Sequence, residues 1–158
     1  MYRPPTVFVD ADACPVRQLI TAASREQGWP VVMVADTSHH IQDGYSQIVT
    51  VDKARDSADL AILNRLRSGD IVVTQDYGVA AMALGKGAAV LHHSGIEYTP
   101  ENIDLLLMER HISGKQRRAG GRVRGPRPRK PEENLRFDQA FRSLLSRMSQ
   151  RKREGQTE

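Results

Sequence analysis

The first 91 residues alternate between short apolar, mostly β-branched runs and stretches with helical spacing. The apolar runs predict strands at residues 6–9, 31–35, 47–51, 71–74 and 88–91, and the stretches between them predict helices near 15–27, 56–67 and 77–84. Alternating strands and helices favour parallel pairing and right-handed crossovers, with helices covering both faces of the sheet. We therefore predict an α/β fold with three layers, α/β/α, around a mainly parallel sheet.

Proline, glycine and threonine mark the helix ends. Pro15 suits the first turn of a helix, where its missing N–H costs nothing, and Gly28 suits the end of that helix. Thr99 and Pro100 predict the start of another helix, with Thr99 as its cap. A last helix is expected over residues 132–150, where Leu135, Phe137, Phe141, Leu144, Leu145 and Met148 recur with helical spacing.

Charge divides the chain more sharply than its net value of +4 suggests. Residues 1–109 carry 14 Asp and Glu against 8 Lys and Arg, whereas residues 110–130 carry nine basic residues and no acid. We expect an α/β domain over 1–113, a basic Gly/Arg/Pro-rich strap over 114–131, the last helix over 132–150 and a disordered tail over 151–158. An acidic body followed by a basic strap favours a polyanionic partner. The alternative is that the strap is only a solvated linker.

Length and composition exclude several classes of protein. A chain of 158 residues is long enough for one domain with its own core. It contains neither the roughly 20 continuous apolar residues of a membrane span nor a signal peptide, so we expect a cytoplasmic protein without a membrane partner. Its single cysteine, Cys14, excludes an internal disulfide and a cysteine-rich zinc site.

Acidic residues follow the predicted strands where a parallel sheet places its ligands. Asp10 and Asp12 follow the first strand, Asp76 follows the fourth, and Asp56 and Asp59 open the helix after the third. Ligands of open parallel sheets bind outside the carboxyl ends of the strands, so these side chains are the candidate site.

Carboxylates that converge without basic neighbours repel one another and are stabilised by a divalent cation. Oxygen ligands suit Mg²⁺ or Mn²⁺, and such a site can activate water against a phosphodiester. Each acid also has a structural alternative. Asp12 could cap the first helix, Asp56 or Asp59 could stabilise a helix N-terminus, and Asp70 could serve the turn before the fourth strand.

Other residues offer weaker signals. Asp10-Ala11-Asp12 after an apolar strand also suggests a phosphatase of the haloacid-dehalogenase type, with Asp10 as nucleophile. Cys14 is either a reactive thiol at a helix N-terminus or a small buried side chain, and burial is the favoured alternative. The pairs His39-His40 and His92-His93 are interpreted as mainly structural, because adjacent residues point in different directions.

The basic strap offers phosphate contacts rather than base recognition, since glycine and proline separate its cations and no aromatic residue lies among them. The expected partner is RNA or another nucleic acid. The residues that would bind it are Arg117, Arg118, Arg122, Arg124, Arg127, Arg129 and Lys130.

Several motifs together resemble the YaiI/YqxD family of uncharacterised bacterial proteins, the UPF0178 type. They are Val9-Asp10-Ala11-Asp12-Ala13-Cys14-Pro15-Val16, Asp56-Ser57-Ala58-Asp59, Gly69-Asp70-Ile71-Val72-Val73-Thr74-Gln75-Asp76, Tyr98-Thr99-Pro100, Met108-Glu109-Arg110-His111, Arg117-Arg118-Ala119-Gly120-Gly121 and Gly125-Pro126. The resemblance extends to the helix around Phe141 and so covers nearly the whole chain.

The resemblance implies a PIN-like fold, whose nuclease members hold divalent metals on acids at the ends of parallel strands. By position, the resemblance makes Asp10, Asp59 and Asp76 the metal ligands. Asp56 is the alternative to Asp59 as the ligand from the middle of the chain. Asp12 would help to position water. The sequence thus predicts a Mg²⁺- or Mn²⁺-dependent nuclease acting on RNA. The alternative is a nucleic-acid-binding or regulatory protein that keeps this fold without turnover.

Overall fold

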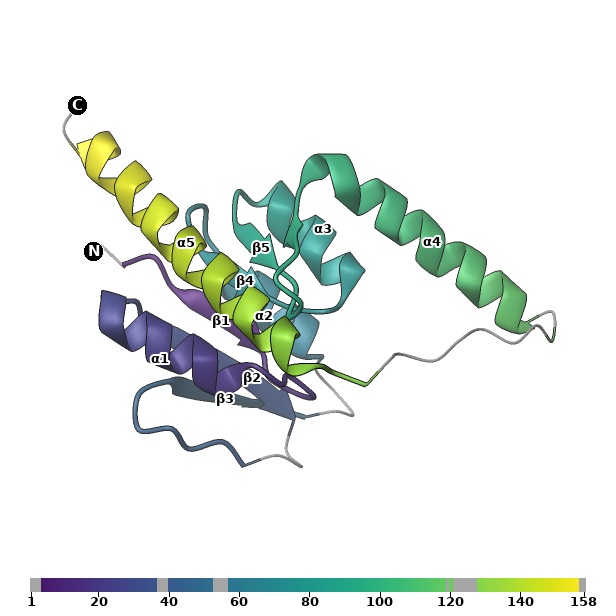
Figure 1. The fold of residues 1–158 in the computed structure, drawn as a ribbon, viewed down its shortest axis with the longest axis horizontal. Helices are drawn as coiled ribbons and strands as arrows, with labels where there is room; N and C mark the ends of the chain where they lie inside the picture. The colour runs from purple at the N-terminus through teal and green to yellow at the C-terminus, as the bar shows by residue number, and fades with distance from the viewer. Residues whose placement is uncertain (1–3, 37–39, 53–56, 119, 121–127, 157–158) are drawn as a thin grey trace.

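The computed structural model describes residues 4–36, 40–52, 57–118, 120 and 128–156, and for residues 110 and 116–118 it describes the backbone alone. Within these residues, six strands form one sheet in the order β3-β2-β1-β4-β5-β6 (Figure 1). The five strands expected from the sequence are β1 (Val7–Asp10), β2 (Val31–Asp36), β3 (Gln47–Val51), β4 (Ile71–Val73) and β5 (Ala89–Leu91), and all of them pair in parallel. The α/β class with a mainly parallel sheet is confirmed.

A sixth strand, β6 (Glu97–Tyr98), was not expected from the sequence. It pairs antiparallel with β5 through a short turn, in which His92 N–H donates to the Ile96 carbonyl at 2.9 Å. A two-residue strand is too short for periodicity to reveal.

Helices cover both faces of the sheet, because alternate strand residues point to opposite sides. One face, with Val7, Val9 and Met33, packs against α1 (Arg17–Gln27) and α5 (Pro131–Gln156). The opposite face, with Phe8 and Val72, packs against α2 (Ala58–Arg65) and α3 (Tyr77–Gly85). Figure 1 shows the sheet between these two helix pairs. The three-layer arrangement is therefore confirmed.

The predicted helix ends are mostly found. Gly28 ends α1 in the left-handed conformation, with φ of 74°. Helix α4 (Pro100–Arg118) begins with a reciprocal cap: Thr99 Oγ1 accepts the Asn102 N–H at 3.2 Å, and Asn102 Oδ1 accepts the Thr99 N–H at 3.0 Å. Helix α1, however, begins at Arg17, after Pro15.

Two boundaries differ from expectation. Helix α4 continues through residues 114–118, which the sequence assigns to the strap, and α5 continues through 151–156, which it assigns to a disordered tail. Both extensions consist largely of good helix formers such as Lys, Arg, Gln and Glu, so propensity supports them once a packed turn precedes them. Helix α5 buries Phe137, Phe141, Leu144 and Leu145, but Leu135 is 67% exposed and does not join the core.

Within the ranges that the structure describes, none of the helices has the length and apolar character needed to cross a membrane.

Candidate acidic site at the centre of the sheet

The strand order places a crevice between β1 and β4. Chain connections from β1 run to one side of the sheet, toward β2, and those from β4 run to the other, toward β5. This reversal is the topological switch point, beside which open α/β sheets bind their ligands at the carboxyl ends of the strands. Asp10 is the last residue of β1, and Thr74, Gln75 and Asp76 follow β4 directly.

A cavity of about 380 Å³ opens at this point and is lined by Asp10, Gln75, Asp76 and Tyr77. Thr74 forms hydrogen bonds to both acids of this cavity, Asp10 and Asp76. Its hydroxyl donates to Asp10 Oδ2 at 3.3 Å and accepts the Asp76 N–H at 3.0 Å. A side chain that is 3% exposed thus ties the end of β1 to the loop after β4.

Asp10 lies in an acidic and partly desolvated environment. Burial is the main reason that its pKa rises from 3.8 to about 6, and the negative charges of Asp59, Asp12 and Asp76 raise it further, while the Thr74 hydrogen bond opposes them. The other three acids predicted from the sequence therefore act on Asp10 from α2, from the loop after β1 and from the loop after β4. Asp56, the alternative to Asp59 as a metal ligand, lies outside the described residues.

Asp76 also has a structural role that the sequence did not indicate. Its Oδ1 accepts the N–H groups of Gly78 at 2.8 Å and Val79 at 3.2 Å, which makes Asp76 the N-cap of α3. Ser57, not an acid, caps α2, because its hydroxyl accepts the Leu60 N–H at 3.2 Å. Asp59 lies in the first turn of that helix and is half-buried.

Asp12 does not cap α1, contrary to one alternative from the sequence. Its Oδ2 instead accepts the N–H of Asp36 at 3.0 Å, which joins the loop after β1 to the end of β2. The α1 N-terminus has Val16 at its cap position and no side-chain cap. Between Asp12 and this helix, Ala13 has a φ of 58°, a strained left-handed conformation for a residue with a Cβ.

Asp36 is an acid at this edge that sequence reasoning missed. It ends β2 and is only 4% exposed. The rule that selected Asp10, an acid at the end of an apolar strand, would have selected Asp36 too.

Asp70, Cys14 and His92, which the sequence also singled out, have structural roles or are buried. Asp70 is structural: its carboxylate accepts the N–H groups of Thr6 at 2.9 Å and Arg67 at 2.8 Å, at the amino ends of the strands. Cys14 is 8% exposed, and burial raises the pKa of its thiol, so the buried alternative holds. Burial lowers the pKa of His92 to about 4, so this imidazole is neutral at pH 7. A hydrogen bond of 2.8 Å joins its Nδ1 to Ser94 Oγ.

The predicted nucleic-acid-binding residues are placed only in part. Arg122, Arg124 and Arg127 lie outside the described residues, and the backbones of Arg117 and Arg118 end α4. Arg129 is engaged within the fold: it donates to the His93 carbonyl at 2.9 Å and to Asn134 Oδ1 at 2.7 Å. Lys130 is exposed.

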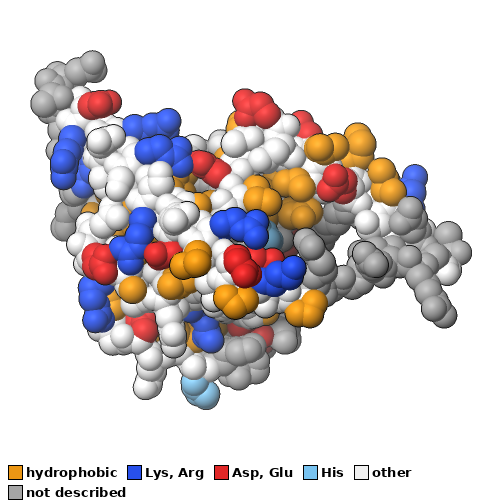
Figure 2. Space-filling model, in the orientation of Figure 1, with side chains coloured by type: hydrophobic (Ala, Val, Ile, Leu, Met, Phe, Trp, Pro, Cys, Tyr) orange, Lys and Arg blue, Asp and Glu red, His pale blue; other side chains and the backbone are white. Residues whose placement is uncertain are grey.

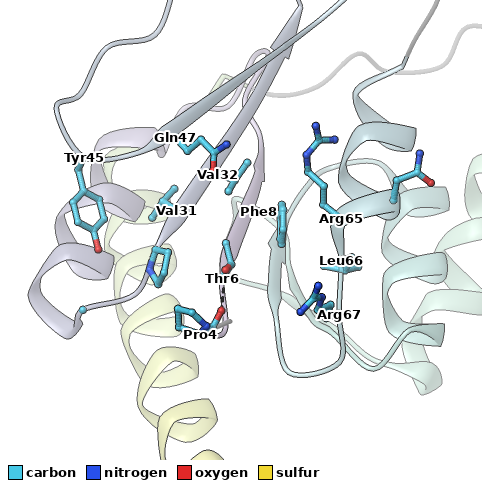
Figure 3. A pocket seen from close by; sticks show the side chains of 13 residues that line it. Pro4, Thr6, Phe8, Val31, Val32, Tyr45, Gln47, Arg65, Leu66 and Arg67 are labelled. Carbon is cyan, nitrogen blue, oxygen red and sulfur yellow. Dashed lines mark hydrogen bonds between the residues drawn. The ribbon is translucent and has the colours of Figure 1, made fainter. Parts of the chain in front are cut away.

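A larger cavity, of about 740 Å³, lies elsewhere. It opens at the amino ends of β1, β2 and β3, and its lining includes Phe8, Val32, Arg65, Leu66 and Arg67 (Figure 3). The candidate acids are at the opposite ends of the same strands, so this cavity is separate from their site.

The donor set at the acidic site fits a hard divalent cation in chemistry, since it consists of carboxylate and hydroxyl oxygens. The positions of these donor atoms, however, do not form a metal site. Among the described residues, no three His, Cys, Asp or Glu side chains lie close enough together to hold a metal ion. Metal binding would therefore require side chains of the site to rotate.

The fold and the site define a doubly wound α/β protein with a carboxylate-lined crevice at its switch point. The family model described as "Uncharacterized BCR, YaiI/YqxD family" matches residues 8–147. The chain belongs to this family, as the sequence motifs predict.

Similar proteins from bacteria match most of the chain. A UPF0178 protein of Ruminiclostridium cellulolyticum is 56% identical over 135 residues, which cover 85% of this chain and 88% of the relative. One from Clostridium acetobutylicum is 48% identical over 143 residues, 89% of this chain and 97% of the relative. One from Oceanobacillus iheyensis is 42% identical over 144 residues, 89% and 99% respectively. No solved structure gives a significant match, so the PIN-like fold stays a prediction.

Proposed function

We propose that this protein is a Mg²⁺- or Mn²⁺-dependent phosphodiesterase that cleaves RNA at the crevice between β1 and β4. The observation that carries the proposal is that the negative charges of Asp59 and Asp76, which come from two other segments of the chain, raise the pKa of Asp10 at the switch point of the sheet. Like charges brought together in a partly buried place destabilise the fold, and a cation or a proton relieves that cost.

In this proposal Asp10, Asp59 and Asp76 hold the cation, and Asp12 helps to position water. The bound cation would supply charge for the developing phosphoryl oxygens and lower the pKa of a bound water. Without the cation Asp10 has a pKa of about 6, so a proton and the cation would compete for this carboxylate close to neutral pH. Thr74 fixes the Asp10 carboxylate, and Asp76 keeps α3 at the rim of the cavity.

The basic strap would hold the phosphates of the nucleic acid near this crevice. Arg129 and Lys130, the described cations at its C-terminal end, lie directly before α5. Arg129 Nη2 donates to the carbonyl of His93, two residues after β5, so this cation lies at the same edge of the sheet as Asp10. A cationic segment beside a carboxylate site suits a polyanionic substrate.

A second candidate function is nucleic-acid binding without turnover. It is favoured because two of the acids have structural roles: Asp76 Oδ1 caps α3, and Asp12 Oδ2 accepts the N–H of Asp36 at the end of β2. In that case the carboxylates shape the loops, and the strap alone carries binding.

Calorimetry with Mn²⁺ and cleavage of labelled single-stranded RNA separate the two functions. We expect wild type to bind Mn²⁺ and to cleave RNA only with the metal present, and Asp10→Asn to lose both. Asp104→Asn, which changes an exposed acid on α4, is the matched control and should behave as wild type. Binding of RNA with no metal uptake at millimolar Mn²⁺ would refute the nuclease and support the binding protein.

A further inference from the structure

Helix α4 extends away from the rest of the domain. Its first turns pack on the core through Ile103, which is 6% exposed, and through the partly buried Leu106 and Leu107. The rest of the helix projects beyond α3 (Figure 1). Figure 2 shows hydrophobic side chains gathered along this projecting helix, on the face turned toward the viewer.

The exposed apolar residues of α4 form one straight stripe. Leu105 is 59% exposed, Met108 60% and Ile112 48%. Exposed Glu101 lies four residues before Leu105, and exposed Lys115 lies three residues after Ile112. The spacing along the stripe is therefore 4, 3, 4 and 3, which is the spacing of the apolar seam in a coiled coil.

The two ends of this stripe carry opposite charges. The acid Glu101 stands at its N-terminal end, the cation Lys115 stands at its C-terminal end, and Met108 lies midway between them. If two copies of α4 pair antiparallel about a two-fold axis at Met108, Glu101 of each copy faces Lys115 of the other. Leu105 and Ile112 then face each other across the axis. A parallel pair would instead place Glu101 against Glu101 and Lys115 against Lys115.

We propose that this protein forms a homodimer through an antiparallel pair of α4 helices, with the seam Glu101, Leu105, Met108, Ile112 and Lys115. The partner is a second copy of the same chain, because the stripe is complementary to itself under a two-fold rotation and such isologous contacts are the usual form of dimers. The seam spans about 21 Å of helix, from 1.5 Å per residue. An interface of that length is small, so we expect reversible dimerisation at micromolar concentrations.

The first experiment measures molar mass by sedimentation equilibrium between about 1 and 200 μM for a set of charge variants. Wild type is expected to pass from monomer to dimer in this range. Glu101→Lys and Lys115→Glu should each weaken the dimer about fivefold to tenfold, because the two-fold axis turns each substitution into two repulsive contacts. The double variant Glu101→Lys/Lys115→Glu should restore the wild-type dissociation constant. Glu132→Lys, which reverses an exposed acid in the first turn of α5, is the matched control and should change nothing.

The second experiment tests the axis itself. Met108→Cys places two thiols beside each other in the dimer, so diamide, which accepts their two electrons and two protons, should link the chains by a disulfide. Ile96→Cys is the control, because Ile96 is 59% exposed and lies in the β5–β6 turn, off the seam. Met108→Glu should abolish the dimer while circular dichroism stays unchanged, since this side chain is largely in solvent.

A wild-type mass that stays monomeric at 200 μM overturns the proposal. A dimer that Met108→Glu leaves intact, or that the double charge exchange fails to restore, also overturns it, because the interface then lies elsewhere or pairs in the other direction. The dimer does not depend on the acidic site: Asp10→Asn should leave the molar mass unchanged, so failure of the nuclease proposal and failure of this one are separate results.

Discussion

Thr74 Oγ1 donates a hydrogen bond to Asp10 Oδ2 at 3.3 Å, although the two residues are 64 positions apart in the sequence. The bond crosses the boundary between β1 and β4, the strands that flank the switch point. It favours the ionised carboxylate and so opposes the burial and the neighbouring acids that raise the pKa of Asp10. The charge state of Asp10 is therefore set by its contacts in the folded chain.

Replacing Thr74 by valine should raise the pKa of Asp10 above about 6, because valine keeps the shape of threonine but donates no hydrogen bond. Thr74→Ser keeps the hydroxyl and is expected to leave this pKa near its wild-type value. The measurement is an NMR titration of the Asp10 carboxyl carbon in both variants. Equal pKa values in wild type and Thr74→Val would show that the hydrogen bond does not control the ionisation.

The contribution of Asp10 to the free energy of unfolding should fall as pH rises from 4 to 7, and it is read from the difference between wild type and Asp10→Asn. This difference is needed because the lowered pKa of His92 gives a contribution of opposite sign in both proteins. In this window Asp10, with a pKa of about 6 in the folded chain and 3.8 in the unfolded chain, binds more protons when folded. The contribution of Asp10 is at most about 3 kcal/mol, at 1.36 kcal/mol per pKa unit. Asp10→Asn should remove it, so this variant should gain stability over wild type at pH 7 but not at pH 4. Urea denaturation at both pH values checks the sign.

Asp76→Ala should lower the free energy of unfolding by about 1 kcal/mol, because Asp76 Oδ1 accepts two N–H groups at the start of α3. Asp76→Asn should lose much less, since asparagine is an equally good N-cap. In the nuclease proposal both variants lose metal-dependent cleavage. Comparing stability and turnover of this pair therefore separates the structural role of Asp76 from its proposed role as a ligand. An unstable Asp76→Asn would contradict the capping role.

Gly95→Ala should destabilise the fold by at least about 2 kcal/mol. Gly95 has a φ of +96°, and a Cβ there would lie 2.9 Å from the backbone carbonyl oxygen of Arg136 in α5. Gly28→Ala is the matched control, because Gly28 has a φ of +74° but no atom within 4 Å of the added carbon. It should cost about 1 kcal/mol, the conformational term alone. Equal losses in thermal or urea unfolding would mean that α5 can move away from the β5–β6 turn.

The regular part of this fold follows from the sequence, because local physics specifies it. Apolar runs such as Val7 to Val9 alternate with helical spacing, and Gly28 and Thr99 end or begin helices through their own backbone and side-chain chemistry. These are short-range preferences that act within a few residues. The family could be identified from the same residues, since its motifs are short and contiguous.

The long helices were harder to bound. Residues 114–118 contain a glycine and several cations, a composition that is typical of a linker, yet they continue α4. Leu135 has the spacing of a core residue on α5 and is nevertheless exposed. Periodicity defines a helical face, but packing decides how much of that face is covered.

The sequence alone determined the class of fold, the family, and the acids that stand after the strands. Only the tertiary structure decided what these acids do, because hydrogen bonds between distant segments assign their oxygens. Asp76 caps α3, Asp12 holds the end of β2, and Thr74 holds Asp10. Spacing places a carboxylate at an edge of the sheet, whereas its partners and its pKa depend on which other segments the sheet order brings beside it.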